Sequence, residues 1–229
     1  ATGNVSAGTS TFAMLVMEKP LSKVYREIDM VTTPTGLPVA MSHANNGTTH
    51  INAWVSIFKA FAERAGAEVD EKKIFEILFN ESLKGDKDCG GVISYGYYSG
   101  EGVTHLNEGR PVIAYMPDSA FNLANLMRAH LYTALAAVKI GMDILIKEEK
   151  VSIDRITGHG GLFTQKGICQ SYLAAALNAP VTCMDTASEG GPWGMAILAA
   201  FLINGNGRKL GDYLDQEIFA NLTGSNIEP

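Results

Sequence analysis

The sequence contains only three cysteines, Cys89, Cys169 and Cys183, among 229 residues. They are odd in number and widely separated, and none has the short spacing of a zinc or redox motif. This scarcity argues against a disulfide-stabilised secreted scaffold and against a cysteine-rich metal protein. We expect reduced, mostly buried thiols in a cytoplasmic protein.

Positive charge and long apolar runs are also scarce. The chain has 18 Lys and Arg residues against 24 Asp and Glu, which gives a formal net charge of −6. A protein that neutralises nucleic-acid phosphates needs a basic face, so we expect no nucleic acid as a partner. No stretch reaches the roughly 18 consecutive apolar residues typical of a transmembrane helix, and no basic-then-apolar leader opens the chain. We therefore expect no membrane partner.

Hydrophobic residues are plentiful, at 46% of the chain, and short apolar segments predict strands in its first part. Residues 10–17 follow a glycine-containing turn and read STFAMLVM, which is typical of a strand. Residues 28–33 and 38–41 flank a turn that contains Pro34 and Gly36, and this arrangement predicts a hairpin. The chain is therefore expected to open with a group of strands.

Helical spacing follows, first from Trp54 and then after Asp70, which we predict to cap a second helix. The longest helix is predicted to open at Ser119. Thereafter a strand, a helix, a second strand at 181–184 and an apolar helix at 193–203 alternate. Early strands followed by strand–helix alternation predict an α/β fold, in which helices flank a mixed sheet.

Two glycine-containing turns could hold an anion. The first contains Gly8, Thr9 and Ser10 at the start of a strand. Small residues let backbone N–H groups approach a phosphate, and a hydroxyl can donate a further hydrogen bond. A turn of this composition is also common without any ligand.

The second turn joins a strand to a helix and reads Thr157-Gly-His-Gly-Gly161. Gly158, Gly160 and Gly161 would expose N–H groups beside a helix N-terminus, a general arrangement for nucleotide phosphates. The spacing is neither GxGxxG nor a Walker loop. His159 is a candidate catalyst by residue type, but a histidine in such a turn is more often simply hydrogen-bonded.

Two further segments are chemically rich. Glu189 to Gly194 precedes the apolar helix, and we interpret it chiefly as a capping and packing device with the Glu189 charge near the helix N-terminus. The polar stretch from Ser42 to His50 could bind a polyol or a metal. It lacks adjacent carboxylates and helical histidine spacing, so no metal site is predicted and hydrogen bonding to its own backbone is the default.

Taken in order, these segments resemble the second half of FGGY carbohydrate kinases. The strongest match runs from Gly158 to Asn204, where Gly-Gly after a strand, a helix with Gln and Ala, Pro-Val, an acidic-glycine stretch and Gly-x-Ala-x-Leu-Ala follow in the family's order. Gly3 to Phe12 resembles the family's Gly-Thr turn. Arg128 and Ala129 resemble its Arg-Ala helix.

This resemblance implies an actin-like ATPase domain with the ribonuclease H-like fold. Residues 1–229 would form the C-terminal nucleotide-binding domain of a two-domain sugar kinase, with ATP as cofactor and Mg²⁺ carried on its phosphates. One of Thr164, Gln165 or Lys166 would meet the adenine, and the helix from Trp193 would close the far side of the nucleotide pocket. The nucleotide-binding residues that the resemblance implies are Gly8, Thr9, Ser10, Gly158, Gly160, Gly161 and Thr164.

The implied partners are ATP, a sugar substrate and the N-terminal domain of the same parent chain, and a homodimer is left open. A ketopentose such as xylulose is the expected sugar, as in xylulokinase-like members. The family's catalytic Asp lies just upstream of the Gly-Thr turn, so we assign no catalytic residue in this chain. The chain opens with Ala1 rather than Met, which suggests a piece of a longer protein, inactive by itself.

Two departures from the family pattern leave the sugar open. Tyr132 stands where the family usually has an acidic residue, and Ala175 where it usually has Asp. One alternative is a non-catalytic, sugar- or nucleotide-sensing relic of a kinase. Another is a dinucleotide-binding dehydrogenase domain with Asp185 as acidic partner of the Gly158 turn, although the glycine spacing and the missing βαβ pattern argue against it.

Overall fold

The computed structural model describes residues 1–220 and 222–229. Its main element is a 7-stranded sheet in the order β3-β4-β2-β1-β7-β8-β9, accompanied by a two-stranded ribbon of β5 and β6. β1 pairs in parallel with β7 and β7 with β8, whereas the other pairs are antiparallel, so the sheet is mixed as predicted. The strands are β1 (Thr2–Ala7), β2 (Thr11–Val16), β3 (Asp29–Thr32), β4 (Pro38–Ala44), β5 (Ile93–Tyr95), β6 (Val112–Ala114), β7 (Arg155–His159), β8 (Val181–Met184) and β9 (Gly224–Ile227).

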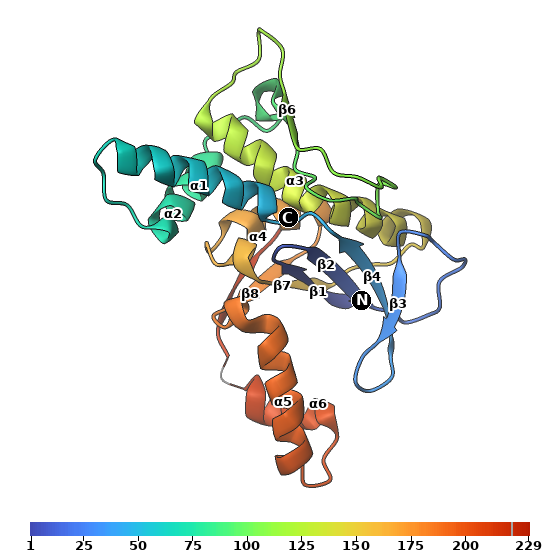
Figure 1. The fold of residues 1–229 in the computed structure, drawn as a ribbon. Coiled ribbons are helices and arrows are strands. Elements are labelled where there is room, and N and C mark those ends of the chain that lie inside the picture. Colours follow the sequence, from blue (N-terminus) through green and yellow to red (C-terminus); the bar gives the residue numbers. More distant parts are fainter. Residues whose placement is uncertain (221) are drawn as a thin grey trace.

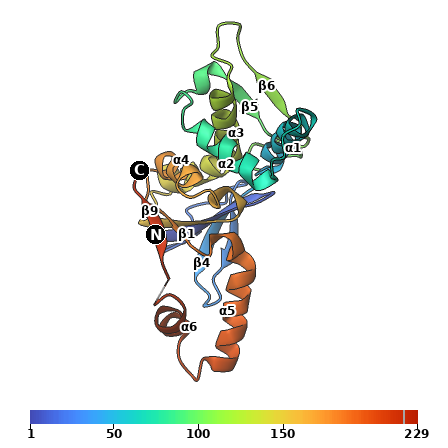
Figure 2. The same ribbon diagram turned by 90° about the vertical axis from the view of Figure 1, so that its left-hand side faces the viewer.

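Helices α1 to α4 lie on one side of the sheet, whereas α5 and α6 project from the other side (Figures 1 and 2). The β5–β6 ribbon lies beyond α3, at the end of the molecule farthest from α5 (Figure 2). The helices are α1 (Thr49–Arg64), α2 (Glu71–Ser82), α3 (Leu123–Asp143), α4 (Ile168–Leu177), α5 (Gly190–Asn204) and α6 (Leu210–Tyr213).

Most predicted elements are present, with shifted boundaries. The 28–33 and 38–41 hairpin corresponds to β3 and β4, and Asp70 caps α2 by accepting a hydrogen bond from Lys73 N at 2.7 Å. Helix α1 begins at Thr49 rather than Trp54. The polar residues before Trp54 are thus already part of the helix. Helix α3 begins at Leu123, capped by Asn122 rather than opened by Ser119.

The core lies between the sheet and α3. Val5 and Leu15 are fully buried on the helix-facing side of β1 and β2, and Leu131 and Val138 are fully buried on α3. The segment Leu123–Glu148, α3 with the π-helical turn that follows it, is long and apolar enough to cross a membrane by length and composition alone. Of its most apolar window, 56% is buried inside the domain, which is the behaviour of a core helix in a globular protein.

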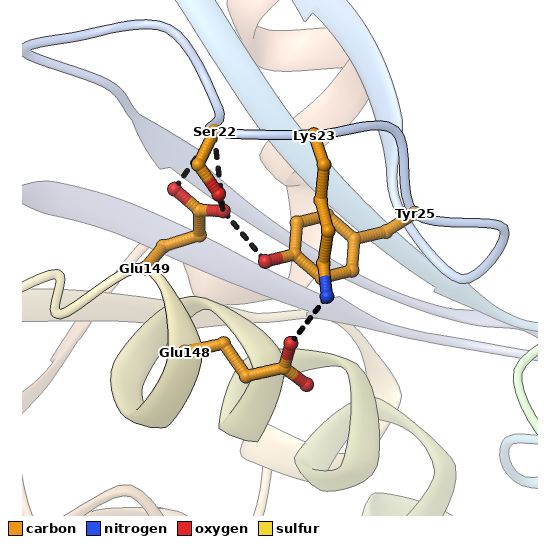
Figure 3. A network of polar contacts seen from close by, with 5 residues as sticks. All are labelled: Ser22, Lys23, Tyr25, Glu148 and Glu149. Carbon is orange, nitrogen blue, oxygen red and sulfur yellow. Dashed lines mark hydrogen bonds and ion pairs between the residues drawn. The ribbon is translucent and has the colours of Figure 1, made fainter.

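A polar clasp fixes the loop between β2 and β3 to the end of this long helix (Figure 3). The Ser22 backbone amide donates to both Glu149 carboxylate oxygens at 3.2 and 3.0 Å, and the Ser22 hydroxyl donates to Oε1 at 2.5 Å. The Tyr25 hydroxyl donates to the same oxygen at 2.6 Å. Lys23 forms an ion pair of 3.0 Å with Glu148. The clasp therefore anchors the approach to β3 at the sheet end remote from the Gly8 turn.

Candidate functional site

The turn formed by Gly8, Thr9 and Ser10 joins β1 to β2. The segment from Gly3, which the sequence analysis interpreted as part of a turn before a strand, forms strand β1 itself. The two inner carbonyls of the turn are occupied: Gly47 N donates to Thr9 O at 2.7 Å and Thr48 N to Gly8 O at 2.9 Å. The backbone amides of Thr9 and Ser10 donate to no acceptor in the part of the chain that the structure describes. These free N–H groups can bind an anion.

The N-terminus of α1 abuts this turn. Gly47 and Thr48, whose amides bond to the turn, immediately precede the helix, and the first turn of α1 carries no acidic residue. A helix N-terminus has unpaired N–H groups and a partial positive charge, so it favours a bound phosphate. Two independent features therefore favour negative charge at the same place.

The second glycine turn lies beside the first. β1 and β7 run in parallel with Ser6 opposite His159, so both turns leave the sheet at its same edge. Gly160 has φ of +95°, and a Cβ there would lie 2.5 Å from Ala7 O, so only glycine fits against β1. Thr164 bonds through its hydroxyl to Gly161 O at 2.8 Å. Gly160 and Gly161 therefore lie beside the end of β1 that leads into the Gly8 turn, with Thr164 bonded to Gly161; that these residues bind nucleotide stays a prediction.

Gly158 has a different environment from the other predicted site residues. It is buried, and a Cβ at this position would lie 2.9 Å from the Phe163 ring and 3.1 Å from Cys183 Sγ. The space beside Gly158 is therefore occupied by Phe163 and Cys183, and it is not open to a ligand. That Gly158 contacts nucleotide stays a prediction without geometric support.

A hollow of about 630 Å³ opens beside the two turns. It is bounded by the start of α1, by α2 and by the segment that follows β7. Its apolar walls are Ile51, Phe75, Phe79 and Leu162. Its polar lining residues are Thr48, Asn52, Glu71, Lys72, Thr164 and Gln165. An apolar hollow of this volume with a few polar groups is typical of a small-molecule site.

Sequence reasoning missed the contribution of α1 and α2 to this hollow. Phe75 and Phe79 stand four residues apart, which places them on one face of α2, and this spacing was a usable signal. Asn52 was missed because α1 was expected to begin after it. Of the three residues proposed to meet the adenine, Thr164 and Gln165 line the hollow and Lys166 does not; its ammonium pairs with Asp185 at 2.8 Å.

His159 and α5 lie on the other side of β7. His159 Nε2 is 3.3 Å from Asn4 Oδ1, and burial lowers the pKa of the His159 imidazole, so it is a hydrogen-bonded histidine. A Cβ on Gly190 would lie 2.2 Å from His159 Nδ1, which places the start of α5 against this ring. No residue of α5 lines the hollow, and α5 projects away from it (Figure 2). The structure therefore gives no support to the expectation that the helix from Trp193 closes the nucleotide pocket, which stays a prediction.

The chemistry of the remaining candidate groups is limited. Within residues 1–220 and 222–229, no three His, Cys, Asp or Glu side chains gather closely enough to hold a metal ion. The carboxylate of Asp185, the acidic residue of the dehydrogenase alternative, also accepts from Thr223 Oγ1 at 2.5 Å. Glu189 was expected to act by its charge, but its side chain lies outside the described part of the structure.

The three cysteine thiols are free and buried. Burial raises the pKa of the Cys183 thiol to about 11 and raises that of Cys169 further. Both thiols therefore stay protonated at neutral pH and are poor nucleophiles. Neither is a candidate for chemistry at the site.

The fold is similar to those of solved kinases. A xylulose kinase from Rhodospirillum rubrum matches over 100% of this chain with a TM-score of 0.71 and 17% identity, and a ligand-bound xylulose kinase from Lactobacillus acidophilus matches equally, at 14% identity. Plasmodium falciparum glycerol kinase, solved with ADP, matches 92% of the chain with a TM-score of 0.63 and 14% identity. This chain covers 42%, 43% and 40% of those three chains, respectively. At such identities the likeness shows the fold alone.

A search of curated proteins finds no match. A family model does match: the C-terminal domain of the FGGY family of carbohydrate kinases aligns with residues 3–203. That range includes both glycine turns, α1 to α4 and most of α5. The family match, the mixed sheet flanked by helices and the fold shared with solved kinases together rule out the dehydrogenase alternative. The chain belongs to the FGGY family of carbohydrate kinases and has the actin-like ATPase fold of that family's C-terminal domain.

Proposed function

We propose that residues 1–229 are the C-terminal nucleotide-binding domain of a two-domain, ATP-dependent carbohydrate kinase. One observation carries the proposal: the hollow of about 630 Å³ is lined by Thr48 at the N-terminus of α1, and the Thr48 amide bonds to the turn whose own amides are free. An apolar compartment joined to an anion site matches a nucleotide, which has a flat base at one end and phosphates at the other. The ADP bound in the similar glycerol kinase supports it.

Different residues of the chain would contact the base and the phosphates of the nucleotide. Phe75, Phe79 and Leu162 would bury the base, and the Asn52 and Gln165 amides, which can donate and accept, would meet its polar edge. Thr9 and Ser10 would bind the phosphates through their amides. When bound, ATP supplies the phosphoryl group, and Mg²⁺ on its phosphates neutralises charge. The residues of this chain would hold the nucleotide and orient its phosphates.

Phosphoryl transfer needs a second reactant held in line with the phosphate. No residue of this chain is assigned as the base that accepts the sugar proton. We propose that the N-terminal domain of the same protein provides most of the sugar site and that the two domains close during turnover. We also propose a cytoplasmic location, which the free thiols support.

The substrate class is the finer part of the proposal. We propose a ketopentose such as xylulose, supported by the resemblance and by the similar folds of two xylulose kinases. The test is phosphoryl transfer by the full-length protein, followed as ADP release and screened against pentuloses, pentitols, glycerol and heptuloses. Turnover with a pentulose supports the proposal. ADP binding without transfer to any polyol would favour the sensing relic instead.

A further inference from the structure

The polar stretch from Ser42 to His50 ends in a buried histidine that the proposed nucleotide contacts do not use. The sequence predicted bonding of this stretch to its own backbone, but Asn46 bonds to a distant loop: its Oδ1 accepts from Tyr98 N at 2.8 Å and from Ser99 N at 3.0 Å. His50 is the second residue of α1 and is 8% exposed. Its ring packs against other side chains of α1 and α3.

A second buried histidine, His130 of α3, lies against His50. The centroids of the two rings are 4.5 Å apart, and their planes are inclined by 65°. Trp54 completes the cluster, because its ring centroid lies 5.6 Å from that of His130 and its indole nitrogen donates to His50 Nε2 at 3.3 Å. His130 Nδ1 and the Ser94 hydroxyl of β5 share a hydrogen bond of 2.7 Å. The histidine pair therefore joins the start of α1 to α3 and β5.

The hydrogen bonds of the pair suit uncharged rings. An indole N–H can only donate, so His50 Nε2 is the acceptor and carries no proton. His50 Nδ1 and His130 Nε2 are buried and have no hydrogen-bond partner among the described residues. In the charged form both nitrogens of a ring carry protons. Each ring would then have a buried N–H without an acceptor, and the second N–H of His50 would confront that of Trp54, which is costly.

No neighbouring charge compensates a protonated ring. Among the described residues, the histidine that forms an ion pair is His105, and neither ring of the pair does. Two charged groups nearby are bonded elsewhere, the Glu101 carboxylate to a side-chain amide at 3.0 Å and the Arg128 guanidinium to a carbonyl of α2 at 3.1 Å. Helix α1 carries no charged residue before Lys59. The other titratable groups beside the cluster are uncharged in acid, namely Tyr98 and Cys89.

The pair also lies close to the proposed nucleotide site. Thr48, directly before α1, bonds to the Gly8 turn, and the first turn of α1 lines the large hollow. The second half of α1 is less buried, with Phe61 at 72% exposed. The buried residues of α1 are His50, Ile51 and Val55. The position of the helix N-terminus therefore depends on few contacts, and the contact of His50 with His130 is one of them.

We infer that His50 and His130 are positioning residues for the nucleotide: the uncharged pair keeps the start of α1 against α3, and proton uptake releases it. The inference rests on the proposed function, because it concerns the same site. Burial lowers the pKa of both imidazoles from the ordinary value of 6.5, that of His130 to about 3. Such a group stabilises the fold above its unfolded pKa, and this contribution is lost as pH falls below it. Nucleotide affinity therefore decreases in acid.

The test is calorimetric titration of the full-length protein with ADP at pH 7.5 and at pH 5.5. Phenylalanine keeps a ring but takes up no proton, so the variants are His50→Phe and His130→Phe. Between these pH values one such imidazole shifts the equilibrium by up to about tenfold. Wild type should accordingly lose about 3- to 10-fold more affinity than either variant. Protonation of the ADP phosphates affects all proteins alike and cancels in this comparison.

The matched control is His105→Gln, which removes an exposed histidine outside the pair and should follow wild type at both pH values. A merely structural pair, when changed, would weaken ADP binding by the same factor at both. Equal acid losses in wild type and in variants that bind ADP at pH 7.5 would overturn the inference and leave the proposed function standing. A wild-type protein that gives no heat with ADP at pH 7.5 would overturn the proposed function and the inference with it.

A second measurement needs no variant, should both replacements prevent folding. Amide hydrogen exchange of wild type at pH 7.5 and 5.5 compares α1 with α2, so that the intrinsic pH dependence of exchange cancels. Protection of α1 relative to α2 should fall about 3- to 10-fold in acid, since α1 loses its contact with α3. A constant ratio of the two protections would contradict release of α1 and overturn the inference.

Discussion

At the scale of single residues, the glycines of the two turns have different structural roles. Gly160 and Gly158 are required by their neighbours, because a Cβ at either position would press against Ala7 or against Phe163 and Cys183. Gly8 is different. A Cβ there would meet only Ser10 O at 3.9 Å, an ordinary contact. The space beside Gly8 is therefore open to a ligand. A side chain can be introduced at this position with little strain on the backbone.

Replacing Gly8 should separate nucleotide binding from folding. In the full-length kinase, Gly8→Val should raise the KM for ATP by about tenfold or more, a loss of about 1.4 kcal/mol, because the branched side chain would cover the free amides of the turn. Gly211→Ala is the control, since a Cβ on Gly211 meets nothing within 4 Å. An ATP KM unchanged by Gly8→Val would remove the turn from the phosphate site.

The clasp at Glu149 makes stability depend on pH. Hydrogen bonds from Ser22, and then from Tyr25, lower the pKa of the Glu149 carboxyl from its ordinary value of 4.5. A group whose folded pKa is depressed stabilises the fold above its unfolded pKa, and this contribution is lost as pH falls through the folded pKa.

Glu149→Gln should accordingly lower the melting temperature at neutral pH, where the carboxylate is the better acceptor. The difference in melting temperature between wild type and variant should narrow as the pH falls below 4.5 and through the lowered pKa of Glu149, where the wild-type carboxyl takes up a proton. Thermal unfolding at a series of pH values measures this gap. A gap that stays constant below pH 4.5 would show that the carboxylate charge is not what holds the clasp.

At the scale of elements, helix starts position the site. α1 directs its N-terminus at the Gly8 turn, and α2 presents Phe75 and Phe79 to the large hollow. The start of α2 depends on Asp70, which caps it at 2.7 Å. Loss of this cap should loosen the first turn of α2, where Glu71 and Lys72 line the hollow.

Asp70→Ala should therefore destabilise the protein by about 1 kcal/mol, the usual value of an N-cap, and lower its melting temperature by roughly 2–4 °C. Asp70→Asn keeps a capping oxygen and is the matched control. Calorimetric unfolding of both variants decides the question. Equal melting temperatures for Asp70→Ala and wild type would show that packing alone holds the start of α2.

The sequence was informative wherever a local pattern matches a physical need. Asp70 before an amphipathic helix, and Pro34 with Gly36 between two strands, predicted α2 and the β3–β4 hairpin correctly. The start of α1 was not predictable from polar residues alone, because it depends on amides of Gly47 and Thr48 bonding to a turn far away in sequence. The large hollow escaped prediction for the same reason: it forms between α1, α2 and the segment after β7.

Helix α5 shows the opposite case, a correctly predicted element whose packing the sequence does not indicate. Its apolar sequence predicted a helix at 193–203, and α5 is helical over Gly190–Asn204. Apolar residues occur all round it, and Leu202 and Ile203 are 85% and 80% exposed. Without an amphipathic pattern, the sequence does not indicate which face packs against the domain.

At the scale of the whole molecule, the helix-covered side of the sheet carries the proposed nucleotide site. The large hollow lies between α1, α2 and the segment after β7, and the Gly8 turn lies against the start of α1. In the proposed function this domain holds the nucleotide, and the N-terminal domain provides most of the sugar site. We therefore expect the chain of residues 1–229 to bind nucleotide and to transfer no phosphate.

That expectation has its own measurement. ADP release by residues 1–229 in the presence of ATP and a pentulose should equal the background without protein, whereas the full-length kinase should turn over under the same conditions. Sugar-dependent ADP release by the 229-residue chain alone would place the catalytic base inside it and contradict the proposed division between the two domains.

The central claim is that this domain holds the nucleotide, and calorimetric titration of residues 1–229 with ADP and Mg²⁺ tests it most directly. We predict binding at a single site, weakened about tenfold or more in Gly8→Val and unchanged in Gly211→Ala, with no heat from a pentulose of comparable concentration. A folded, monodisperse chain that gives no heat with ADP, or that binds ADP equally well with Gly8→Val, would contradict the account.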